Sequence, residues 1–356
     1  MKKILHILTD SNIGGAGTHL LNILKFYDRS RFIIEVALPQ GSRLIPLVKE
    51  TDTKVIEVPH MRDISFSIKT TLALVFQLAR EKPTLIHTHA SLAGRLAARF
   101  LRIPVLYTRH YCVDGGRRSG ASFLQDRVIA TSPEVEAGLL RSGIKPQLIT
   151  TINNGVAPLP PLDENERKTI RARYNIPPDA FVVSQIGRLT PVKGHEYSLN
   201  AMKLLFDINQ NIVLLLAGDG ELEAQLKKRI KSEGIKNVYM TGFVSKIHEI
   251  HNITDLQLNA SDTETSCQVL LEGMSLGIPA VVTNGGGNPL TVPHGQCGLV
   301  VPCRDATAIA QAITQIESDP ALYKRLSEGA LAAYNNNFRA EDMTRKLEAV
   351  YEEILK

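Results

Sequence analysis

Short runs of aliphatic and β-branched residues alternate along the chain with longer stretches of helical periodicity. In the first half we expect strands at 4–8, 33–38, 54–58, 84–88, 105–108 and 127–131. Helical patterns such as 67–80 and 91–102 separate these runs. Strands that alternate with helices are typical of βαβ units, so the pattern predicts a parallel sheet with helices on both faces.

A polar, proline-rich segment at 153–167 interrupts this pattern and is expected to be a linker. The pattern then resumes, with strands expected at 181–187, 212–218, 237–242, 255–260, 280–283 and 298–301. The sequence therefore predicts an α/β protein with two doubly wound, Rossmann-like domains, at 1–157 and 158–338. Ligands of such sheets bind at the carboxyl ends of the strands, and we expect the site in a cleft between the domains.

The last helix is expected at about 339–356. Its apolar residues form one stripe, made by Met343, Leu347, Val350, Tyr351 and Ile354. The stripe must pack on a domain, but the pattern alone does not indicate which one.

Composition and charge narrow the class of protein. The chain has 356 residues, 44% of them hydrophobic and 22% charged, as in soluble globular proteins. Its four cysteines show no CxxC spacing, which argues against a zinc site and a disulfide scaffold. The apolar run at the N-terminus is too short for a signal peptide, and no stretch is long enough to span a membrane, so we expect a cytoplasmic protein.

The charge is unevenly distributed. Residues 1–157 hold 21 Lys and Arg against 12 Asp and Glu, a formal charge of +9, whereas the remainder carries −4. A basic first half indicates an anionic partner for that half.

A glycine-rich turn, 10–24, links the first strand to a helix. Glycines let backbone N–H groups approach a phosphate, and a helix N-terminus favours negative charge. The dinucleotide fingerprint is incomplete, because Leu20 stands where the third glycine would be. A plain tight turn is the alternative to a phosphate or sugar contact.

Two cations follow the first strand of the second half, in the segment 186–199. Arg188 and Lys193 stand where a strand ends and a helix begins. Such a pair can bind a diphosphate and stabilise the charge on a leaving phosphate. The alternative is two solvated loop cations.

Two glutamates, Glu264 and Glu272, lie in the segment 261–287, which ends in three glycines. Thr265 and Gln268 fit a capping box, so a helix is expected from about Ser266. Glu264 then precedes the helix and Glu272 lies two turns inside it. The carboxylates would be about 10 Å apart, which suits two ends of an extended ligand. Individually each has the simpler interpretation of a surface glutamate.

Taken together, these motifs resemble the retaining GT-B glycosyltransferases of the large family 4 group. The resemblance covers nearly the whole chain and rests on GGAGTH, TRH at 108–110, NNGV at 153–156, GRLTPVKG, AGDGE at 217–221, TGFV at 241–244, the segment 261–287 and GLVVP. It implies two Rossmann-like domains, with the acceptor on the first and a nucleotide sugar on the second. It also implies that the last helix returns to the first domain.

The resemblance implies roles for individual residues. Glu272 would hold the ribose hydroxyls, Glu264 the sugar hydroxyls, and His110 would approach the sugar near the anomeric centre. Arg188 and Lys193 would bind the diphosphate, and these two with Glu264 and His110 form the implied catalytic set. The implied donor-binding residues are Gly15, Gly17, Gly187, Arg188, Lys193, Phe243, Val244, Glu264, Ser266, Cys267, Gln268, Val269 and Glu272.

By the same resemblance the reaction would need no metal or cofactor, and no DxD motif is present. A hexose would move from a UDP- or GDP-sugar to a glycan or lipid-linked acceptor, with attack on the same face as the leaving group. The setting would be cell-envelope polysaccharide or lipopolysaccharide synthesis, in the cytoplasm or at the inner face of the membrane.

The chain departs from the family pattern at two places. Leu290 stands where members often have glutamate, so altered contacts near the sugar are expected. The loop 110–123 matches nothing in the pattern, and we expect it to shape the acceptor site.

Three further features have competing interpretations. Cys267 is better explained as a buried thiol than as a nucleophile, because no activating histidine is identifiable. His87 and His89 share a strand face, but two ligands are too few for a metal site. Arg95, Arg99 and Arg102 share a helix face, which indicates a solvated outer face or a patch for anionic lipid headgroups.

Other function classes stay open from the residues alone. The same architecture would serve epimerisation or hydrolysis of a nucleotide sugar. The basic first half would also suit a non-enzymatic binder of nucleic acid or another anionic polymer, although no recognition motif supports it.

Overall fold

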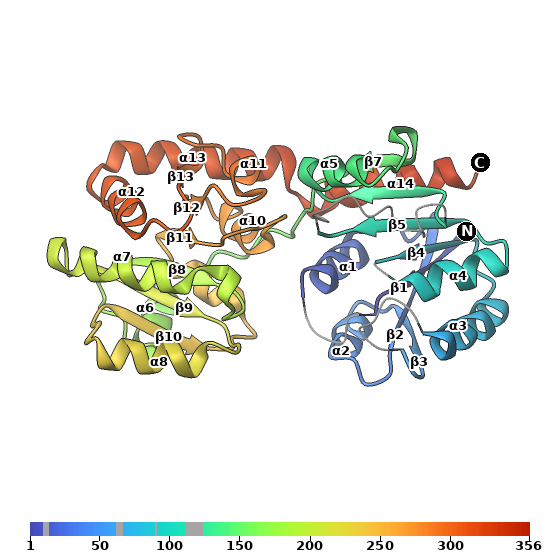
Figure 1. Ribbon diagram of the computed structural model, residues 1–356, viewed down its shortest axis with the longest axis horizontal. Coiled ribbons are helices and arrows are strands. Elements are labelled where there is room, and N and C mark those ends of the chain that lie inside the picture. Colours follow the sequence, from blue (N-terminus) through green and yellow to red (C-terminus); the bar gives the residue numbers. More distant parts are fainter. Residues whose placement is uncertain (10–13, 62–66, 90, 112–123) are drawn as a thin grey trace. The chain divides into compact units, whose positions relative to one another are not determined.

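The structure is a computed structural model that describes residues 1–9, 14–61, 67–89, 91–111 and 124–356 (Figure 1). The chain divides into two compact units. Unit 1 comprises Met1–Ala157 and Phe338–Lys356, and unit 2 comprises Pro158–Asn337.

Unit 1 is built on a parallel sheet with the strand order β3-β2-β1-β4-β5-β6-β7. Its strands are β1 (Lys2–Ile7), β2 (Phe32–Pro39), β3 (Lys54–Val58), β4 (Leu85–Thr88), β5 (Val105–Arg109), β6 (Arg127–Ala130) and β7 (Ile149–Thr151). Its helices are α1 (Gly15–Phe26), α2 (Leu44–Lys49), α3 (Ile68–Glu81), α4 (Leu92–Phe100), α5 (Pro133–Arg141), the 3₁₀ turn η1 (Pro146–Leu148) and α14 (Ala340–Ile354).

Unit 2 repeats this plan with the order β10-β9-β8-β11-β12-β13. Its strands are β8 (Phe181–Ile186), β9 (Ile212–Ala217), β10 (Val238–Gly242), β11 (Leu256–Asn259), β12 (Ala280–Thr283) and β13 (Gly298–Val301). Its helices are α6 (Glu164–Arg173), η2 (Pro191–Lys193), α7 (His195–Ile208), α8 (Glu223–Ser232), α9 (Ile247–Asn252), α10 (Gln268–Met274), α11 (Asn288–Thr291), α12 (Ala306–Ser318) and α13 (Pro320–Asn337).

The predicted fold is confirmed, because both sheets are parallel and doubly wound. All twelve expected strands form, within two residues of the expected ends. Among the described residues, the strand that escaped prediction is β7, which has three half-buried residues at the edge of its sheet. The order of each sheet reverses once, between β1 and β4 in unit 1 and between β8 and β11 in unit 2. These two switch points are where such folds bind ligands.

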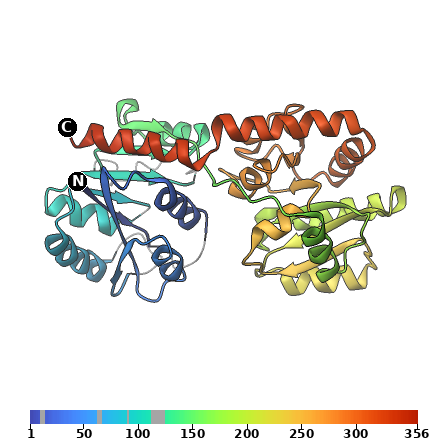
Figure 2. The ribbon, with the colours of Figure 1, turned by 180° about the vertical axis from the view of Figure 1, so that it is seen from behind.

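The C-terminal helix α14 belongs to unit 1. Met343, Leu347, Val350 and Tyr351 join the apolar core that α1 and the strands form, and Figure 2 shows α14, in red, from its own side. The backbone of Val156 pairs with Arg339, which fixes the start of the helix. Gly155 allows this approach, because a Cβ there would lie 2.5 Å from the carbonyl oxygen of Arg339. This explains the glycine of the NNGV motif.

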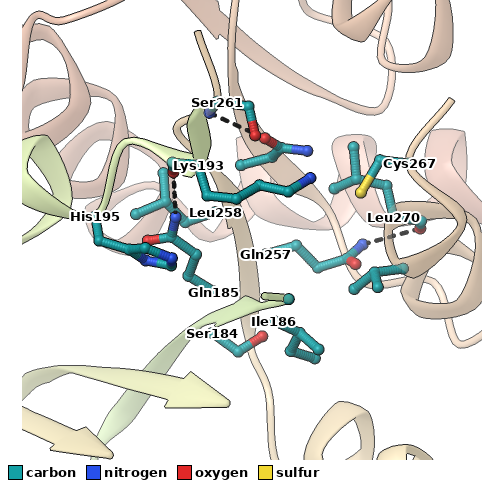
Figure 3. Close-up of a pocket in the computed structure, with 13 residues that line it drawn as sticks. Ser184, Gln185, Ile186, Lys193, His195, Gln257, Leu258, Ser261, Cys267 and Leu270 are labelled. Carbon is teal, nitrogen blue, oxygen red and sulfur yellow. Dashed lines mark hydrogen bonds between the residues drawn. The ribbon is translucent and has the colours of Figure 1, made fainter. Parts of the chain in front are cut away.

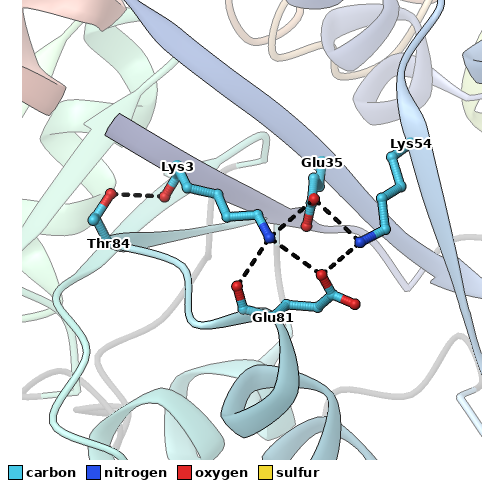
Figure 4. Close-up of polar contacts among 5 residues, drawn as sticks. All are labelled: Lys3, Glu35, Lys54, Glu81 and Thr84. Carbon is cyan, nitrogen blue, oxygen red and sulfur yellow. Dashed lines mark hydrogen bonds and ion pairs between the residues drawn. The ribbon is translucent and has the colours of Figure 1, made fainter. Parts of the chain in front are cut away.

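Four charged side chains join β1, β2, β3 and the end of α3 (Figure 4). Lys3 Nζ lies 3.0 Å from Glu35 and 3.1 Å from Glu81, and Lys54 Nζ lies 3.2 Å and 2.5 Å from the same carboxylates. The network supports the edge of the sheet opposite the carboxyl ends of the strands. In the described part of the chain, every helix is too short or too polar to cross a membrane.

Candidate functional site

The motifs predicted in the second half meet at the switch point of unit 2. β8 and β11 are adjacent and parallel, so their carboxyl ends lie at one edge of the sheet. Gly187 and Arg188 follow β8, and the segment with Glu264 follows β11. Strands that are distant in sequence thus bring the two predicted motifs to one place.

Glycine and glutamine position Lys193 at this edge. Gly194 has a left-handed backbone with φ of 64°, and a Cβ there would lie 2.0 Å from the carbonyl oxygen of Ala260. Only glycine lets the start of α7 lie this close to the end of β11. The buried Gln185 donates a hydrogen bond of 2.7 Å to the carbonyl oxygen of Lys193.

Lys193 and Glu264 form an ion pair. Nζ of Lys193 lies 2.5 Å from Oε2 of Glu264, and the two side chains are 26% and 16% exposed. Burial lowers the pKa of Lys193, but Cys267 and Glu264 together raise it by more, so the net shift is upward. Lys193 therefore carries a fixed positive charge at the switch point.

The triple glycine holds the loop that carries Glu264. The amide of Gly287 donates a hydrogen bond of 2.6 Å to the carbonyl oxygen of Glu264. Gly286 has φ of 59°, and a Cβ there would lie 2.2 Å from the same oxygen. The glycines after β12 thus let two loops touch backbone to backbone, which explains why they follow the glutamate segment.

Arg188 extends the positive charge of the site. Its side chain is exposed, and among the described residues the guanidinium has no ion-pair partner. Its charge opposes the rise in the pKa of Lys193, so the two cations act on the same region. Two adjacent cations of which one is unpaired favour an anionic ligand.

A pocket lies beside these residues in unit 2 (Figure 3). The predicted residues Gly187, Lys193, Cys267 and Val269 line it. In the figure the Lys193 side chain extends toward Cys267. The prediction missed the other polar residues of the lining, because these positions show no chemical pattern in the sequence. They are Ser184, Gln185, His195, Gln257, Asn259 and Ser261.

Cys267 is poorly suited to be a nucleophile. Burial, followed by the charge of Glu264, raises the pKa of its thiol to about 11. The thiol is therefore protonated at neutral pH, and a thiolate is what such chemistry needs.

The predicted capping box is wrong. The helix α10 begins at Gln268 rather than Ser266, its N-cap is Cys267, and no side chain of the described residues caps it. Its start depends instead on packing against β11, since Gln257 donates hydrogen bonds to the carbonyl oxygens of Leu270 and Ile278. Tertiary contact replaces the local cap.

Glu272 lies on α10 and faces a histidine that the sequence did not single out. Its Oε2 lies 3.4 Å from Nε2 of His251, which is fully buried on α9. The Glu272 side chain is 15% exposed, so it is not the freely solvated helix glutamate of the simpler interpretation.

The remaining predicted residues of unit 2 do not line this pocket. Phe243 follows β10 with 63% of its surface exposed, and Val244 packs against the core beside α9. Ser266 is half-buried and Gln268 is buried. Leu290 is 56% exposed on α11, so it is available to solvent.

Gly15 and Gly17 lie in the first turn of α1 in unit 1. A Cβ at Gly15 would meet nothing within 4 Å, whereas one at Gly17 would lie 2.9 Å from the Leu44 side chain. Gly17 therefore has a packing role against α2, and Gly15 leaves open space. Residues 10–13 of the turn lie outside the described part of the chain.

His110 follows β5 and belongs to a cluster of histidines at the switch point of unit 1. Its Nε2 lies 3.1 Å from Nδ1 of His89, and His19 packs edge-on against its ring. The histidines form two overlapping trios, and within each trio the possible metal-ligand atoms lie within 4.8 Å of one another. The trios are His6, His87, His89 and His19, His89, His110. The sequence analysis named His87, His89 and His110 separately and did not join them to His6 and His19, which come from β1 and α1.

The sequence left two interpretations for Arg95, Arg99 and Arg102, a solvated outer face or a patch for anionic lipid headgroups, and Arg95 fits neither. Arg95 is buried, donates a 3.0 Å hydrogen bond to Gln125 and packs over the ring of Tyr107. Arg99 pairs with Asp126 at 3.0 Å, which leaves Arg102 as the exposed member. The three do not form one lipid-facing surface. In the loop 110–123, residues 112–123 lie outside the described part of the chain.

Comparisons with known proteins agree with this architecture. The family model of the glycosyl transferases group 1 matches residues 166–332, and that of glycosyltransferase family 4 matches residues 13–158. The capsular polysaccharide biosynthesis glycosyltransferase CapM of Staphylococcus aureus is 23% identical, over 100% of this chain and 98% of its own.

Two further similarities span both units. A UDP-Gal:α-D-GlcNAc-diphosphoundecaprenol α-1,3-galactosyltransferase of Escherichia coli is 24% identical, over 98% of this chain and 96% of its own. The crystal structure of HepE of Anabaena with UDP and glucose superposes with a TM-score of 0.87 and 22% identity, over 99% and 100% of the chains.

The two family models together match most of the chain, and each falls on one of the two Rossmann-like units. The chain therefore belongs to the GT-B glycosyltransferases of the family 4 type.

Proposed function

We propose that this glycosyltransferase is a retaining, metal-independent hexosyltransferase of cell-envelope polysaccharide synthesis. The observation that carries the proposal is the Lys193–Glu264 ion pair, which lies at the switch point of unit 2 with Arg188 nearby. A site of this kind offers fixed positive charge to a diphosphate and a carboxylate to a sugar.

A UDP-sugar is the proposed donor, ahead of a GDP-sugar. HepE was solved with UDP and with UDP-glucose, and the name of the Escherichia coli relative specifies a UDP-galactose donor. In the proposed complex Arg188 and Lys193 bind the diphosphate, Glu264 accepts hydrogen bonds from sugar hydroxyls, and Glu272 accepts them from the ribose. Phe243 and Val244 border the base.

The proposed chemistry proceeds on one face of the sugar. The acceptor oxygen bonds to the anomeric carbon on the side from which UDP departs, and the acceptor proton passes to an oxygen of the leaving phosphate. The pairing of Glu264 with Lys193 supports this route, because a carboxylate oxygen that already bonds to an ammonium group is less available to attack the anomeric carbon.

The same charges support the proposed metal independence. As the bond to the sugar breaks, negative charge develops on the departing UDP, and preorganised cations stabilise it. Lys193 keeps its proton because its pKa is raised, and Arg188 adds the positive charge of its guanidinium group. These two side chains supply the stabilisation for which other transferases use a divalent cation.

The proposed acceptor is a glycan or a lipid-linked sugar that unit 1 binds at the inner face of the membrane. The Escherichia coli relative acts on a sugar linked to diphosphoundecaprenol, and CapM is named for capsular polysaccharide. The charge of +9 on residues 1–157 favours a phosphorylated acceptor.

The test has two stages. Thermal unfolding is measured with UDP, GDP and ADP, first with EDTA and then with Mg²⁺, because a ligand at 100 times its dissociation constant stabilises the fold by about 2.7 kcal/mol. We expect stabilisation by UDP without metal. Transfer from UDP-glucose and UDP-galactose to lipid-linked acceptors is then followed, and NMR of the product gives the anomeric configuration.

Inversion of the anomeric configuration would contradict the proposed retention. Loss of transfer in EDTA with recovery in Mg²⁺ would contradict metal independence. Free sugar released at the same rate with and without acceptor would identify a hydrolase instead.

A further inference from the structure

A continuous chain of hydrogen bonds runs through the core of unit 1 to His110. Thr108 Oγ1 lies 2.7 Å from Nε2 of His87, whose Nδ1 lies 2.7 Å from the hydroxyl of Tyr351. That hydroxyl lies 3.1 Å from Nε2 of His6. Nδ1 of His6 lies 3.0 Å from Nε2 of His89, and Nδ1 of His89 lies 3.1 Å from Nε2 of His110.

The elements of the switch point place these groups together. His6 on β1 and His87 on β4 are register partners, Thr108 lies on the neighbouring β5, and Tyr351 comes from α14. Thr108, His87, Tyr351, His6 and His89 are all at least 95% buried. His110 is half-buried and is the one member with access to solvent.

The imidazoles of this chain are neutral. Burial lowers the pKa of His6 to about 3 and places the pKa of His87, His89 and His110 well below 6.5. A neutral imidazole has one N–H donor and one acceptor nitrogen.

This rule restricts the chain to two arrangements. His87, His6 and His89 use both ring nitrogens within the chain, so each donates on one side and accepts on the other. The Tyr351 hydroxyl also donates on one side and accepts on the other, because accepting from both histidines would leave its hydrogen buried without an acceptor. All bonds therefore run in one direction, either from His110 toward Thr108 or from Thr108 toward His110.

The direction decides which nitrogen of His110 carries the proton. If the bonds run away from His110, its Nε2 donates to His89 and its Nδ1 is an acceptor. If they run toward it, its Nε2 accepts and its Nδ1 carries the proton. No described residue bonds to Nδ1 of His110, so this atom is available to a ligand.

We propose that Tyr351, His6 and His89 are positioning residues that hold His110 in one tautomer through this directional chain. The inference deepens the proposed function, because it sets whether His110 offers the sugar a donor or an acceptor. A tyrosine on the last helix thus acts on a site residue with which it makes no direct contact.

Tyr351→Phe tests the chain in the full-length protein. The variant keeps the aromatic ring against Phe32 and removes the hydroxyl that joins His87 to His6. In two-dimensional NMR of protein with ¹⁵N-labelled histidine, we expect wild-type His110 in one tautomer. In the variant we expect its two nitrogen shifts to move toward the values of a tautomer mixture.

The matched control is Tyr323→Phe. It removes a partly buried tyrosine hydroxyl, which donates to the carbonyl oxygen of Asp255 in unit 2. The His110 signals of this variant should match the wild type. If Tyr351→Phe does not fold, His6→Leu breaks the chain at the next link and should give the same tautomer mixture.

The kinetic expectation for Tyr351→Phe is a fall in kcat of about 2- to 10-fold, as for loss of one net hydrogen bond. The NMR result needs no substrate, so it separates failure of the chain from failure of the proposed transfer. Unchanged His110 nitrogen shifts in a folded Tyr351→Phe or His6→Leu protein would overturn the inference.

A titration of the wild type with Co²⁺ tests the competing use of these histidines. We expect no intense visible absorption, because the nitrogens of His89 and His110 already bond to each other. A strong band at one equivalent would show that the histidine cluster, through one of its two trios, is a metal site, and would also overturn the inference.

Discussion

Nζ of Lys193 lies 2.5 Å from Oε2 of Glu264, although 71 residues separate them in the sequence. The pair joins the two segments that follow β8 and β11. The same contact therefore balances the charge of Lys193 and holds the Glu264 loop in place. A diphosphate that binds Lys193 must share its ammonium group with Glu264. This competition leads to the first two predictions.

Lys193→Ala removes the half-buried cation and leaves Glu264 without its partner. We expect kcat/KM for the donor to fall by about 100-fold or more, as for loss of one preorganised group that stabilises a transition state. UDP affinity, measured by calorimetry, should fall as well. Lys227→Ala, which breaks an exposed pair on α8, is the control and should leave both values unchanged. Wild-type UDP affinity in Lys193→Ala would contradict the assignment.

Glu264→Gln should separate binding from transfer. The amide keeps the shape of the side chain and removes a negative charge from beside the diphosphate, so UDP should bind as well as or better than to wild type. The sugar loses a charged acceptor, and we expect kcat to fall roughly 10- to 100-fold. Parallel measurements of UDP affinity and kcat check this. Loss of UDP affinity with normal kcat would reverse the roles given to the two residues.

Gly286→Ala should destabilise unit 2 and displace the Glu264 loop. The new methyl group would lie 2.2 Å from the carbonyl oxygen of Glu264, at a φ of 59° that favours glycine. The control is Gly234→Ala, which has φ of 64° but meets nothing within 4 Å. We expect Gly286→Ala to lower the free energy of unfolding in urea by about 1–3 kcal/mol more than the control. Equal losses would show that the close contact has no energetic role.

Local pattern predicts most of the fold and only part of the site. The strands were predictable because buried parallel strands are continuous aliphatic runs. Lys193 and Glu264 were predictable as site residues because each follows such a run. Their contact was not predictable, since it depends on the approach of Gly194 to Ala260. The capping box failed because Gln257, a buried strand residue, holds α10 in its place.

The histidine chain escaped prediction for a related reason. His87 and Tyr351 are 264 residues apart, and no periodicity connects them. Arg95 has the helical spacing of an exposed arginine, but the ring of Tyr107 and the amide of Gln125 give it a buried environment. The spacing of a residue indicates its face on a helix, whereas the side chains that it contacts there depend on which strands and loops the fold brings to that face.

The ion network of unit 1 should make stability depend on pH. In Lys54→Met, Glu35 and Glu81 keep Lys3 as their partner but lose the second ammonium group. Since Lys54 is half exposed, we expect a loss of about 1 kcal/mol in the free energy of unfolding at neutral pH. Lys168→Met, which breaks a pair with both members exposed, should cost less and serves as the control.

The sign of the pH effect follows from Glu81. A hydrogen bond from Lys54 lowers the pKa of Glu81 below its ordinary 4.5, although burial opposes this. A carboxyl whose pKa is lower in the folded state stabilises the protein above pH 4.5, and this contribution is lost as pH falls through the folded value. The stability gap between wild type and Lys54→Met should therefore be constant near neutrality and narrow below pH 4.5 in urea titrations. A gap that stays constant through this acid range would mean that Lys54 acts in unit 1 through packing of its aliphatic stem rather than through its charge.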